Sequence, residues 1–283
     1  MTANAIEVRD LHKRYGEHEA VRGIDIEVRR GEVFGLLGPN GAGKTTTVEI
    51  LEGYRQRTSG EVSVLGHDPA RRQIELRRRI GIVLQSGGIY SLLTPREALA
   101  HWASFYPRPR DVEEVLALSG LAEQADVRSR KLSGGQQRRL DLALALVGDP
   151  ELMFLDEPTT GFDPKARHGA WETVRKLKEL GKTVVLTTHY LDEAQALADR
   201  VAIVKDGRVL AIGPPSELGV GGEQYRVAYK NGGGELVERQ TDDPTSLLHE
   251  LTAQALARGE RLDELSVGRP TLEDVYLELT ADA

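Results

Sequence analysis

The sequence predicts an α/β fold with a parallel sheet, an N-terminal antiparallel β subdomain, a helical insertion and a small C-terminal α+β appendage. Two observations support the parallel sheet: short apolar runs alternate with helical patterns, and the longest helical stretch lies between two such runs. A third observation supports the appendage. The composition shifts at Pro214-Pro215 and at residues 219–222, where glycines cluster.

The elements of the main part follow from these patterns in chain order. Short apolar runs predict strands at residues 5–8, 23–28, 33–37, 152–155 and 183–187. Helical patterns occupy residues 43–51, 94–146 and 165–180, and Pro107 and Pro109 interrupt the second of them. Residues 201–204 and 209–212 are predicted to form a hairpin, because Asp206-Gly207 between them favours a tight turn.

The appendage has its own pattern. Residues 224–230 and 235–240 flank Asn231 and three glycines, which predicts a second hairpin, and helices are predicted at residues 245–258 and 271–279. We therefore expect a main domain at residues 1–217, with its helical insertion at about residues 86–145, and a small α+β domain at residues 218–283. A domain of this size buries too little surface to be more than marginally stable by itself, so it is expected to pack against a neighbour.

Composition excludes several classes of function. Acidic residues (44) exceed basic ones (37), giving a net charge of −7, which argues against nonspecific binding of nucleic acid over the whole surface. The absence of cysteine excludes disulfides, thiolate metal sites and cysteine nucleophiles. No apolar run approaches the roughly 18 to 20 residues that cross a bilayer. If the protein serves a membrane, the membrane-spanning part is therefore expected on another chain.

A glycine-rich motif follows the apolar run at residues 33–37. Its residues fit G-x-x-x-x-G-K-[ST]: Gly38, Pro39, Asn40, Gly41, Ala42, Gly43, Lys44 and Thr45. Backbone N–H groups of such a loop surround phosphate oxygens, Lys44 can reach the β- and γ-phosphates, and Thr45 can ligate Mg²⁺. The alternative is an ordinary turn with a surface lysine. The position between strand and helix favours a P-loop NTPase core that binds a nucleoside triphosphate.

Two acidic residues end the apolar run at residues 152–155. Ligands of open α/β sheets bind at the carboxyl ends of the strands, so Asp156 is a candidate ligand of Mg²⁺ and Glu157 a candidate to polarise the attacking water. A solvated strand end with two surface charges is the alternative. The presence of the phosphate motif in the same chain disfavours this alternative.

A third motif opens the helical pattern that ends at residue 146. Leu132, Ser133, Gly134, Gly135 and Gln136 form another helix N-terminus suited to an anion, although capping chemistry alone also accounts for them. These five residues resemble the signature motif of ATP-binding cassette (ABC) ATPases. The order of the phosphate motif, Gln85, the signature, Asp156-Glu157, Asp163 and His189 is similar to that family over residues 5–215.

The resemblance implies further roles. Tyr15 would stack on the adenine, Thr46 would support the α-phosphate, and Gln85 would sense Mg²⁺ and the attacking water. His189 would contact the γ-phosphate, and Asp163 would lie in a loop at a dimer interface. In this family the signature acts in trans. Because this chain has one phosphate loop and one signature, two complete sites would require an ATP-dependent homodimer.

The resemblance extends to a subgroup. Residues 51–53, 58–60, 93–97 and the C-terminal residues 269–280 look like the ATPases of daunorubicin-resistance-type exporters, whose permease is a separate chain. This implies a subunit that binds and hydrolyses ATP with Mg²⁺ and drives export through a permease. It would be a peripheral protein on the cytoplasmic face of the membrane, with no nucleic-acid partner.

Three other functions remain open at this stage. A soluble cassette ATPase acting on nucleic acid or ribosomes usually has two cassettes, long coiled coils or zinc insertions, which this sequence lacks. A regulatory module that binds ATP without turnover is disfavoured by Glu157 and His189. An importer ATPase is disfavoured by the C-terminal residues.

Overall fold

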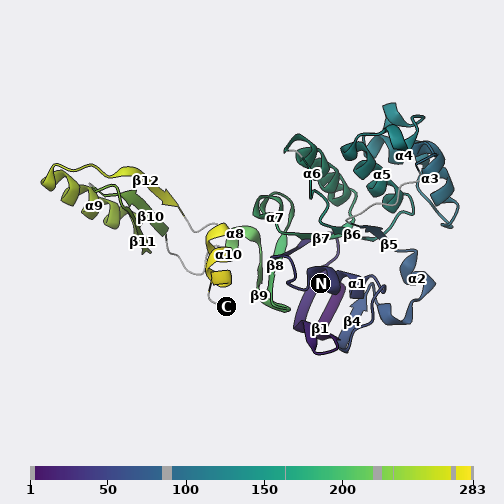
Figure 1. Cartoon of the computed structure of the whole chain (residues 1–283), viewed down its shortest axis with the longest axis horizontal. Helices are drawn as coiled ribbons and strands as arrows, with labels where there is room; N and C mark the ends of the chain where they lie inside the picture. The colour runs from purple at the N-terminus through teal and green to yellow at the C-terminus, as the bar shows by residue number, and fades with distance from the viewer. Residues whose placement is uncertain are drawn as a thin grey trace. The chain divides into compact units, whose positions relative to one another are not determined.

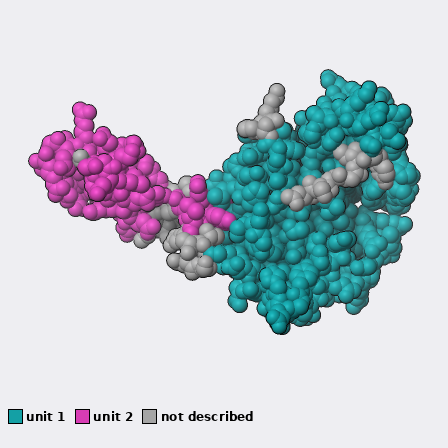
Figure 2. All heavy atoms as spheres, in the orientation of Figure 1, with its two compact units in different colours: residues 1–212 teal, residues 213–283 magenta. Residues whose placement is uncertain are grey.

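The structure, a computed structural model, describes residues 4–84, 91–162, 164–218, 225–231, 233–268 and 272–281. It divides into two compact units, residues 1–212 and residues 213–283, which Figure 2 distinguishes by colour. Each unit has a sheet and helices of its own, so the two are described separately.

The larger unit is organised around a six-stranded sheet in the order β5-β6-β7-β3-β8-β9 (Figure 1). Four pairings in this sheet are parallel: β5 with β6, β6 with β7, β7 with β3, and β3 with β8. The strands are β3 (Val33–Leu37), β5 (Ile80–Val83), β6 (Leu152–Asp156), β7 (Thr183–Thr188), β8 (Arg200–Lys205) and β9 (Arg208–Gly213). Parallel neighbours share one carboxyl edge, so β3, β6 and β7 end side by side.

A second sheet in the same unit is antiparallel, in the order β2-β1-β4. Its strands are β1 (Asn4–Tyr15), β2 (His18–Arg29) and β4 (Ser59–Val64). Along β2, Ile24, Ile26 and Val28 are buried and the residues between them are exposed. This alternation shows that one face of the sheet covers the core and the other faces solvent.

The part of the larger unit that the structure describes contains seven helices. They are α1 (Lys44–Leu51), α2 (Ile74–Arg77), α3 (Pro95–Ala103), α4 (Val112–Leu118), α5 (Gly134–Leu146), α6 (Pro164–Glu179) and α7 (Leu191–Leu197). Short 3₁₀ turns lie at Pro69–Arg71, Ala122–Gln124 and Ser129–Lys131. The insertion starts at α3 with a capping box, in which Thr94 and Glu97 each accept the other's backbone N–H. As predicted, Pro107 and Pro109 lie outside the helices, between α3 and α4.

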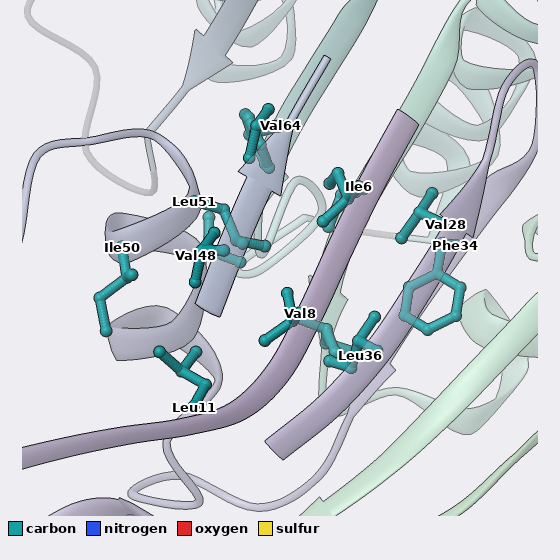
Figure 3. Packing of buried hydrophobic residues seen from close by; sticks show 14 of the residues in the cluster. Ile6, Val8, Leu11, Val28, Phe34, Leu36, Val48, Ile50, Leu51 and Val64 are labelled. Atoms are coloured by element: carbon teal, nitrogen blue, oxygen red, sulfur yellow. The ribbon is translucent and has the colours of Figure 1, made fainter. Parts of the chain in front are cut away.

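Three clusters of buried side chains hold these layers together. The first joins the antiparallel sheet and α1 to one face of the central sheet, and Figure 3 shows part of it, including Ile6, Phe34 and Leu51. The second packs α5, α6 and α7 on the opposite face. Successive residues of β6 alternate between them, because neighbouring side chains of a strand point to opposite faces. The third cluster is the core of the helical insertion, and α5 contributes to it as well.

The smaller unit has a three-stranded antiparallel sheet in the order β11-β10-β12. Its elements are α8 (Pro215–Leu218), β10 (Tyr225–Lys230), β11 (Leu236–Thr241), α9 (Pro244–Arg258), β12 (Asp263–Gly268) and α10 (Leu272–Ala281). Val227 and Tyr229 of β10 pack against Leu251 of α9. Arg226 pairs with Glu238 on β11 and with Asp274 on α10.

The predicted fold class is confirmed, with differences in the elements. Strands β1 and β2 are longer than the apolar runs, because a half-exposed strand tolerates charged residues on its outer face. The patterns do not predict β4, β5, α2 or β12. In β5 the four residues include Gly81, where an added Cβ would lie 2.6 Å from the Ala145 carbonyl oxygen, so glycine allows α5 to approach the strand. Within the described ranges, no helix is long and apolar enough to span a membrane.

Candidate functional site

The glycine-rich loop joins the buried strand β3 to α1, as the motif predicts. Two of its glycines are required by close backbone contacts. A Cβ on Gly38 would lie 2.1 Å from the Val204 carbonyl oxygen, and one on Gly43 would lie 2.5 Å from the Ala20 carbonyl oxygen. Gly43 also has a φ of +98°, a conformation that side-chain-bearing residues rarely adopt. The loop is thus held tightly against β8 and β2.

The other side of this loop is open. A Cβ on Gly41 would meet nothing within 4 Å, and Pro39, Asn40 and Thr45 are exposed. Gly43 is the N-cap of α1 and provides no side-chain cap, so the first N–H groups of the helix have no capping side chain. Such N–H groups, together with the helix dipole, suit a phosphate. Thr46, the next residue, is half-buried, and Ala42 is buried.

Lys44 is the buried charge of the loop. It is only 5% exposed, and its Nζ donates hydrogen bonds to the carbonyl oxygens of Gly38 (2.8 Å) and Pro39 (3.0 Å). Burial lowers its pKa below the ordinary value, while the carboxylates of Glu157 and Asp156 act in the opposite direction. The ammonium group therefore bonds to the loop and is stabilised by the charge of these two carboxylates.

Asp156 and Glu157 lie where β6 ends beside β7. Asp156 is 8% exposed and accepts a hydrogen bond of 2.5 Å from the Thr187 hydroxyl. The same hydroxyl oxygen accepts the Glu157 N–H at 2.9 Å. Thr187 is the cross-strand neighbour of Asp156, so one buried hydroxyl orients both acidic residues.

Glu157 has a strained backbone and faces His189. Its φ is +45°, and such left-handed non-glycine residues cluster at functional sites. Its Oε1 lies 3.5 Å from His189 Nδ1, and its Oε2 accepts a hydrogen bond of 3.0 Å from the Thr160 hydroxyl. The Glu157 side chain is 11% exposed and that of His189 30%, so the pair borders solvent. The structure thus brings together Lys44, Asp156, Glu157 and His189 at one edge of the sheet.

The signature residues begin α5. Ser133 is the N-cap, its hydroxyl accepts the Gln136 N–H at 3.3 Å, and the Gln136 side chain accepts the Ser133 N–H at 2.9 Å. Leu132 is buried, Ser133 and Gly134 are exposed, and Gly135 is half-buried. The motif therefore forms a helix cap, as its residue types allow, and also offers a surface of backbone and hydroxyl groups.

Three predicted residues remain: Tyr15, Gln85 and Asp163. Tyr15 ends β1 and is 40% exposed, with Lys13 Nζ at 4.9 Å and Arg55 Cζ at 5.3 Å from its ring centroid. Such a ring is available for stacking and is already in contact with cations. Gln85 and Asp163 lie outside the residues that the structure describes.

Two site residues were missed by the sequence patterns. One is Thr187, whose hydroxyl bridges the acidic pair. The other is Arg138 of α5, which donates hydrogen bonds to the carbonyl oxygens of Leu84, Asp156 (3.2 Å) and Pro158 (3.3 Å). Arg138 thus connects the signature helix to the ends of β5 and β6. Neither residue carries a motif signal, because each acts through contacts that follow from the order of the strands.

Comparisons with known proteins agree with this geometry. The family described as "ABC transporter" matches residues 21–160. The chain is 38% identical to the daunorubicin resistance ATP-binding protein DrrA3 of Streptomyces coeruleorubidus, over 100% of this chain and 98% of that protein. It is 40% identical to the Nod factor export ATP-binding protein I of Paraburkholderia xenovorans, over 99% of this chain and 98% of that protein.

Solved structures give the same result for the larger unit. CbiO1 of Clostridium perfringens, part of an ABC transporter complex, is 29% identical with a TM-score of 0.69, covering 76% of this chain and 90% of that one. The ATP-binding cassette MJ0796 in a post-hydrolysis state with ADP and Pi is 28% identical with a TM-score of 0.65. That match covers 74% of this chain and 98% of MJ0796.

Proposed function

Because this chain belongs to the ABC transporter family and is an ATPase of that family, we propose that it is the ATP-hydrolysing subunit of a membrane exporter. The observation that carries the proposal is the arrangement of Lys44, Asp156 and Glu157 at the carboxyl edge of the sheet, where Lys44 and Asp156 are buried. Export as the direction is supported by relatives whose names refer to drug resistance and to Nod factor export.

Each site residue receives a role in this proposal. The N–H groups of residues 40–46 and the Lys44 ammonium hold the phosphates, where a desolvated charge interacts strongly. Glu157 orients and polarises the water that attacks the γ-phosphate, and His189 contacts that phosphate. Tyr15 stacks on the adenine. Gln85 is assigned to sensing Mg²⁺ and the water.

The residues also fit Mg²⁺. Mg²⁺ in nucleotide sites is held by one or two carboxylates and completes its shell with other oxygens, among them phosphate oxygens and water. Asp156 offers a buried carboxylate and Thr45 an exposed hydroxyl at the start of α1. Among the described residues, no cluster of three or more His, Asp or Glu side chains could hold a metal by itself. Asp156 and Thr45 would hold the ion with Gln85, and the ion would neutralise phosphate charge.

Two copies of the chain would form the complete sites. Ser133 and Gly134 are exposed at the α5 N-terminus, where a γ-phosphate bound by a second copy can be contacted. The signature residues of each copy would thus close over the nucleotide of the other, and Asp163 would lie in the loop at that interface. ATP would hold the dimer together and hydrolysis would release it.

A permease would transmit this motion across the membrane. A groove of about 520 Å³ lies between β5 and the helices α3 and α5, and Tyr54, Ile82 and Leu84 expose apolar side chains to it. Leu84 is the residue before Gln85, so the groove adjoins a segment assigned to the nucleotide site. We assign this groove to a cytoplasmic helix of the permease. The chain would then act as a peripheral protein at the cytoplasmic face of the membrane, with residues 1–217 as the ATPase domain and 218–283 as a second domain.

The first test is the Glu157→Gln variant of the full chain. The amide cannot accept a proton from water, so we expect kcat for ATP hydrolysis to fall roughly 10²- to 10⁴-fold while ATP binding is kept. Gel filtration with ATP and Mg²⁺ should show a dimer that accumulates. Glu179→Gln, at an exposed position of α6, is the control and should leave turnover unchanged. Undiminished turnover in Glu157→Gln would remove Glu157 from the catalytic role.

The second test identifies the partner. Tagged Glu157→Gln chain with ATP and Mg²⁺ would be used to pull down proteins from native membranes. A membrane protein with several spans in the eluate is expected. Ribosomal or nucleic-acid components without such a protein would contradict the transporter function.

A further inference from the structure

Glu193 is a completely buried carboxyl group close to the site, and nothing above gives it a role. It lies on α7, a helix that begins two residues after His189, and its exposed fraction is 0%. Burying a carboxyl group costs free energy unless polar partners compensate for it. The identity of those partners therefore indicates what the group does.

Its partners come from the loop that follows Glu157 and from α6. Glu193 Oε1 accepts hydrogen bonds from the Thr159 hydroxyl at 2.8 Å and from Trp171 Nε1 at 3.2 Å. The Thr188 hydroxyl lies close to the same carboxyl group. Its Oε2 is buried and makes no hydrogen bond of ordinary geometry within the described part of the chain. All of these neighbours are neutral, so the group does not neutralise a buried cation.

These contacts connect the chain segments that follow the two residues of the proposed catalytic pair, Glu157 and His189. Thr159 is two residues beyond Glu157, and Glu193 is four residues beyond His189. The bond between Thr159 and Glu193 therefore joins the loop that follows Glu157 to the helix that follows His189, and the Glu157 and His189 side chains lie 3.5 Å apart. Thr187, on the strand that precedes His189, bonds to Asp156 and to the Glu157 N–H. Two polar bridges therefore link the segment that carries Glu157 to the segment that carries His189.

We propose that Glu193 is a positioning residue, which keeps the Glu157 loop in register with the helix that follows His189. This inference rests on the proposed roles of Glu157 and His189. An apolar side chain of similar size would fill the same space, but it would leave the Thr159 hydroxyl and the Trp171 N–H without their acceptor. The contacts of Thr187 and Thr160 with Glu157 would remain, but the loop after Glu157 would lose its bond to α7.

The test compares Glu193→Gln, Glu193→Leu and Thr159→Val in the full chain. Gln keeps a neutral acceptor at Oε1, so its kcat is expected to stay within about threefold of the parent. Leu and Val each remove the bridge, and kcat is expected to fall about tenfold, a loss typical of one hydrogen bond, with KM for ATP within about twofold. The double variant should be no slower than the slower single variant, because both changes remove the same bond.

Two controls separate positioning from general damage. Thr173→Val removes a hydroxyl that bonds only to the Gly169 carbonyl within α6, and it should leave kcat unchanged. In a Trp102→Phe background, Trp171 is the remaining tryptophan, and its emission should shift in Glu193→Leu but not in Thr159→Val, because only the former removes the indole's acceptor.

Three outcomes would overturn the inference. They are unchanged kcat in both Glu193→Leu and Thr159→Val, effects that multiply in the double variant, or a loss in Glu193→Gln as large as in Glu193→Leu. If Glu193→Leu does not fold, the kcat values of Thr159→Val and Glu193→Gln still test the inference. The turnover of Glu157→Gln is measured in parallel, and normal turnover in that variant would contradict the proposed function. If Glu157→Gln is inactive while Glu193→Leu and Thr159→Val turn over ATP normally, only the present inference is contradicted.

Discussion

The buried ammonium group of Lys44 bonds to two carbonyl oxygens of its own loop. Burial of the ammonium group lowers its pKa, and the bonds to the carbonyl oxygens compensate part of this cost of desolvation. The carboxylates of Glu157 and Asp156 also favour the charged form. The side chain is thereby ordered at the start of α1, close to where a phosphate would lie. Similar constraint applies to Glu157, whose left-handed backbone is held by the Thr187 hydroxyl.

Replacing Lys44 with alanine is expected to weaken ATP binding about 10- to 100-fold. A charged hydrogen bond contributes about 1.5–3 kcal/mol, and 1.4 kcal/mol corresponds to a factor of ten in Kd. Titration with a fluorescent ATP analogue measures the change. Lys176→Ala, which removes an exposed lysine of α6, should bind as the parent does. Equal affinity in the two variants would contradict the phosphate-loop assignment.

Among the elements, three strands of the central sheet are tied together at the edge opposite the site. Glu151, just before β6, accepts hydrogen bonds from Arg79 at 2.5 and 3.0 Å and from Arg30 at 2.8 Å. Arg79 precedes β5 and Arg30 precedes β3. Arg79 and Arg30 together lower the Glu151 pKa from an ordinary 4.5 to about 2. The ion pairs of Glu151 therefore reinforce the alignment of β5, β6 and β3, in addition to the backbone hydrogen bonds of the sheet.

Glu151→Gln should lower the free energy of unfolding at pH 7 by about 1 kcal/mol, a value reduced for the 43% exposure of this side chain. The pKa is lower in the folded state, so the carboxylate stabilises the fold above pH 4.5. This contribution is lost as the pH falls from 4.5 towards 2, and the two proteins should converge there. Urea unfolding at several pH values measures the difference.

The matched control is Glu172→Gln, which removes an exposed pair with Arg175 on α6 and should change stability by less than about 0.5 kcal/mol. If the free energy of unfolding of Glu151→Gln stays below that of the parent by a constant amount down to pH 2, the ion pairs are not the cause of the difference.

At the scale of the whole molecule, each unit has buried side chains that pack among themselves. Among the described residues, three clusters of buried side chains lie within residues 1–212 and another lies within residues 213–283. All the predicted site residues belong to the first unit. A unit with its own core and site can fold without the other.

A chain of residues 1–212 is therefore expected to unfold cooperatively and to bind ATP with a Kd within about threefold of the full chain. Circular dichroism during heating and the fluorescent ATP titration test this. A chain of residues 1–218 serves as the comparison, because it also retains α8. Broad unfolding or lost binding in both chains would show that the C-terminal unit is required by the first.

Much of the fold was predictable because its signals are local. The run at residues 33–37 coincides with β3, and the one at 183–187 lacks only the last residue of β7. The Asp206-Gly207 turn lies between β8 and β9 as predicted. β4 and β5 escaped prediction because short strands with a glycine lack a distinct period.

The sequence by itself determined the phosphate loop, the acidic pair and the signature, because each is a contiguous motif whose spacing reflects a local backbone requirement. Only the tertiary structure decided that Thr187, Arg138 and Glu193 belong beside them. Their contacts span 18 to 54 residues of the chain and depend on β6 pairing with β7 and on α5 packing against both β5 and the insertion. A hydrogen bond between distant segments leaves no period or motif in the chain, so it emerges only once the strands are in order.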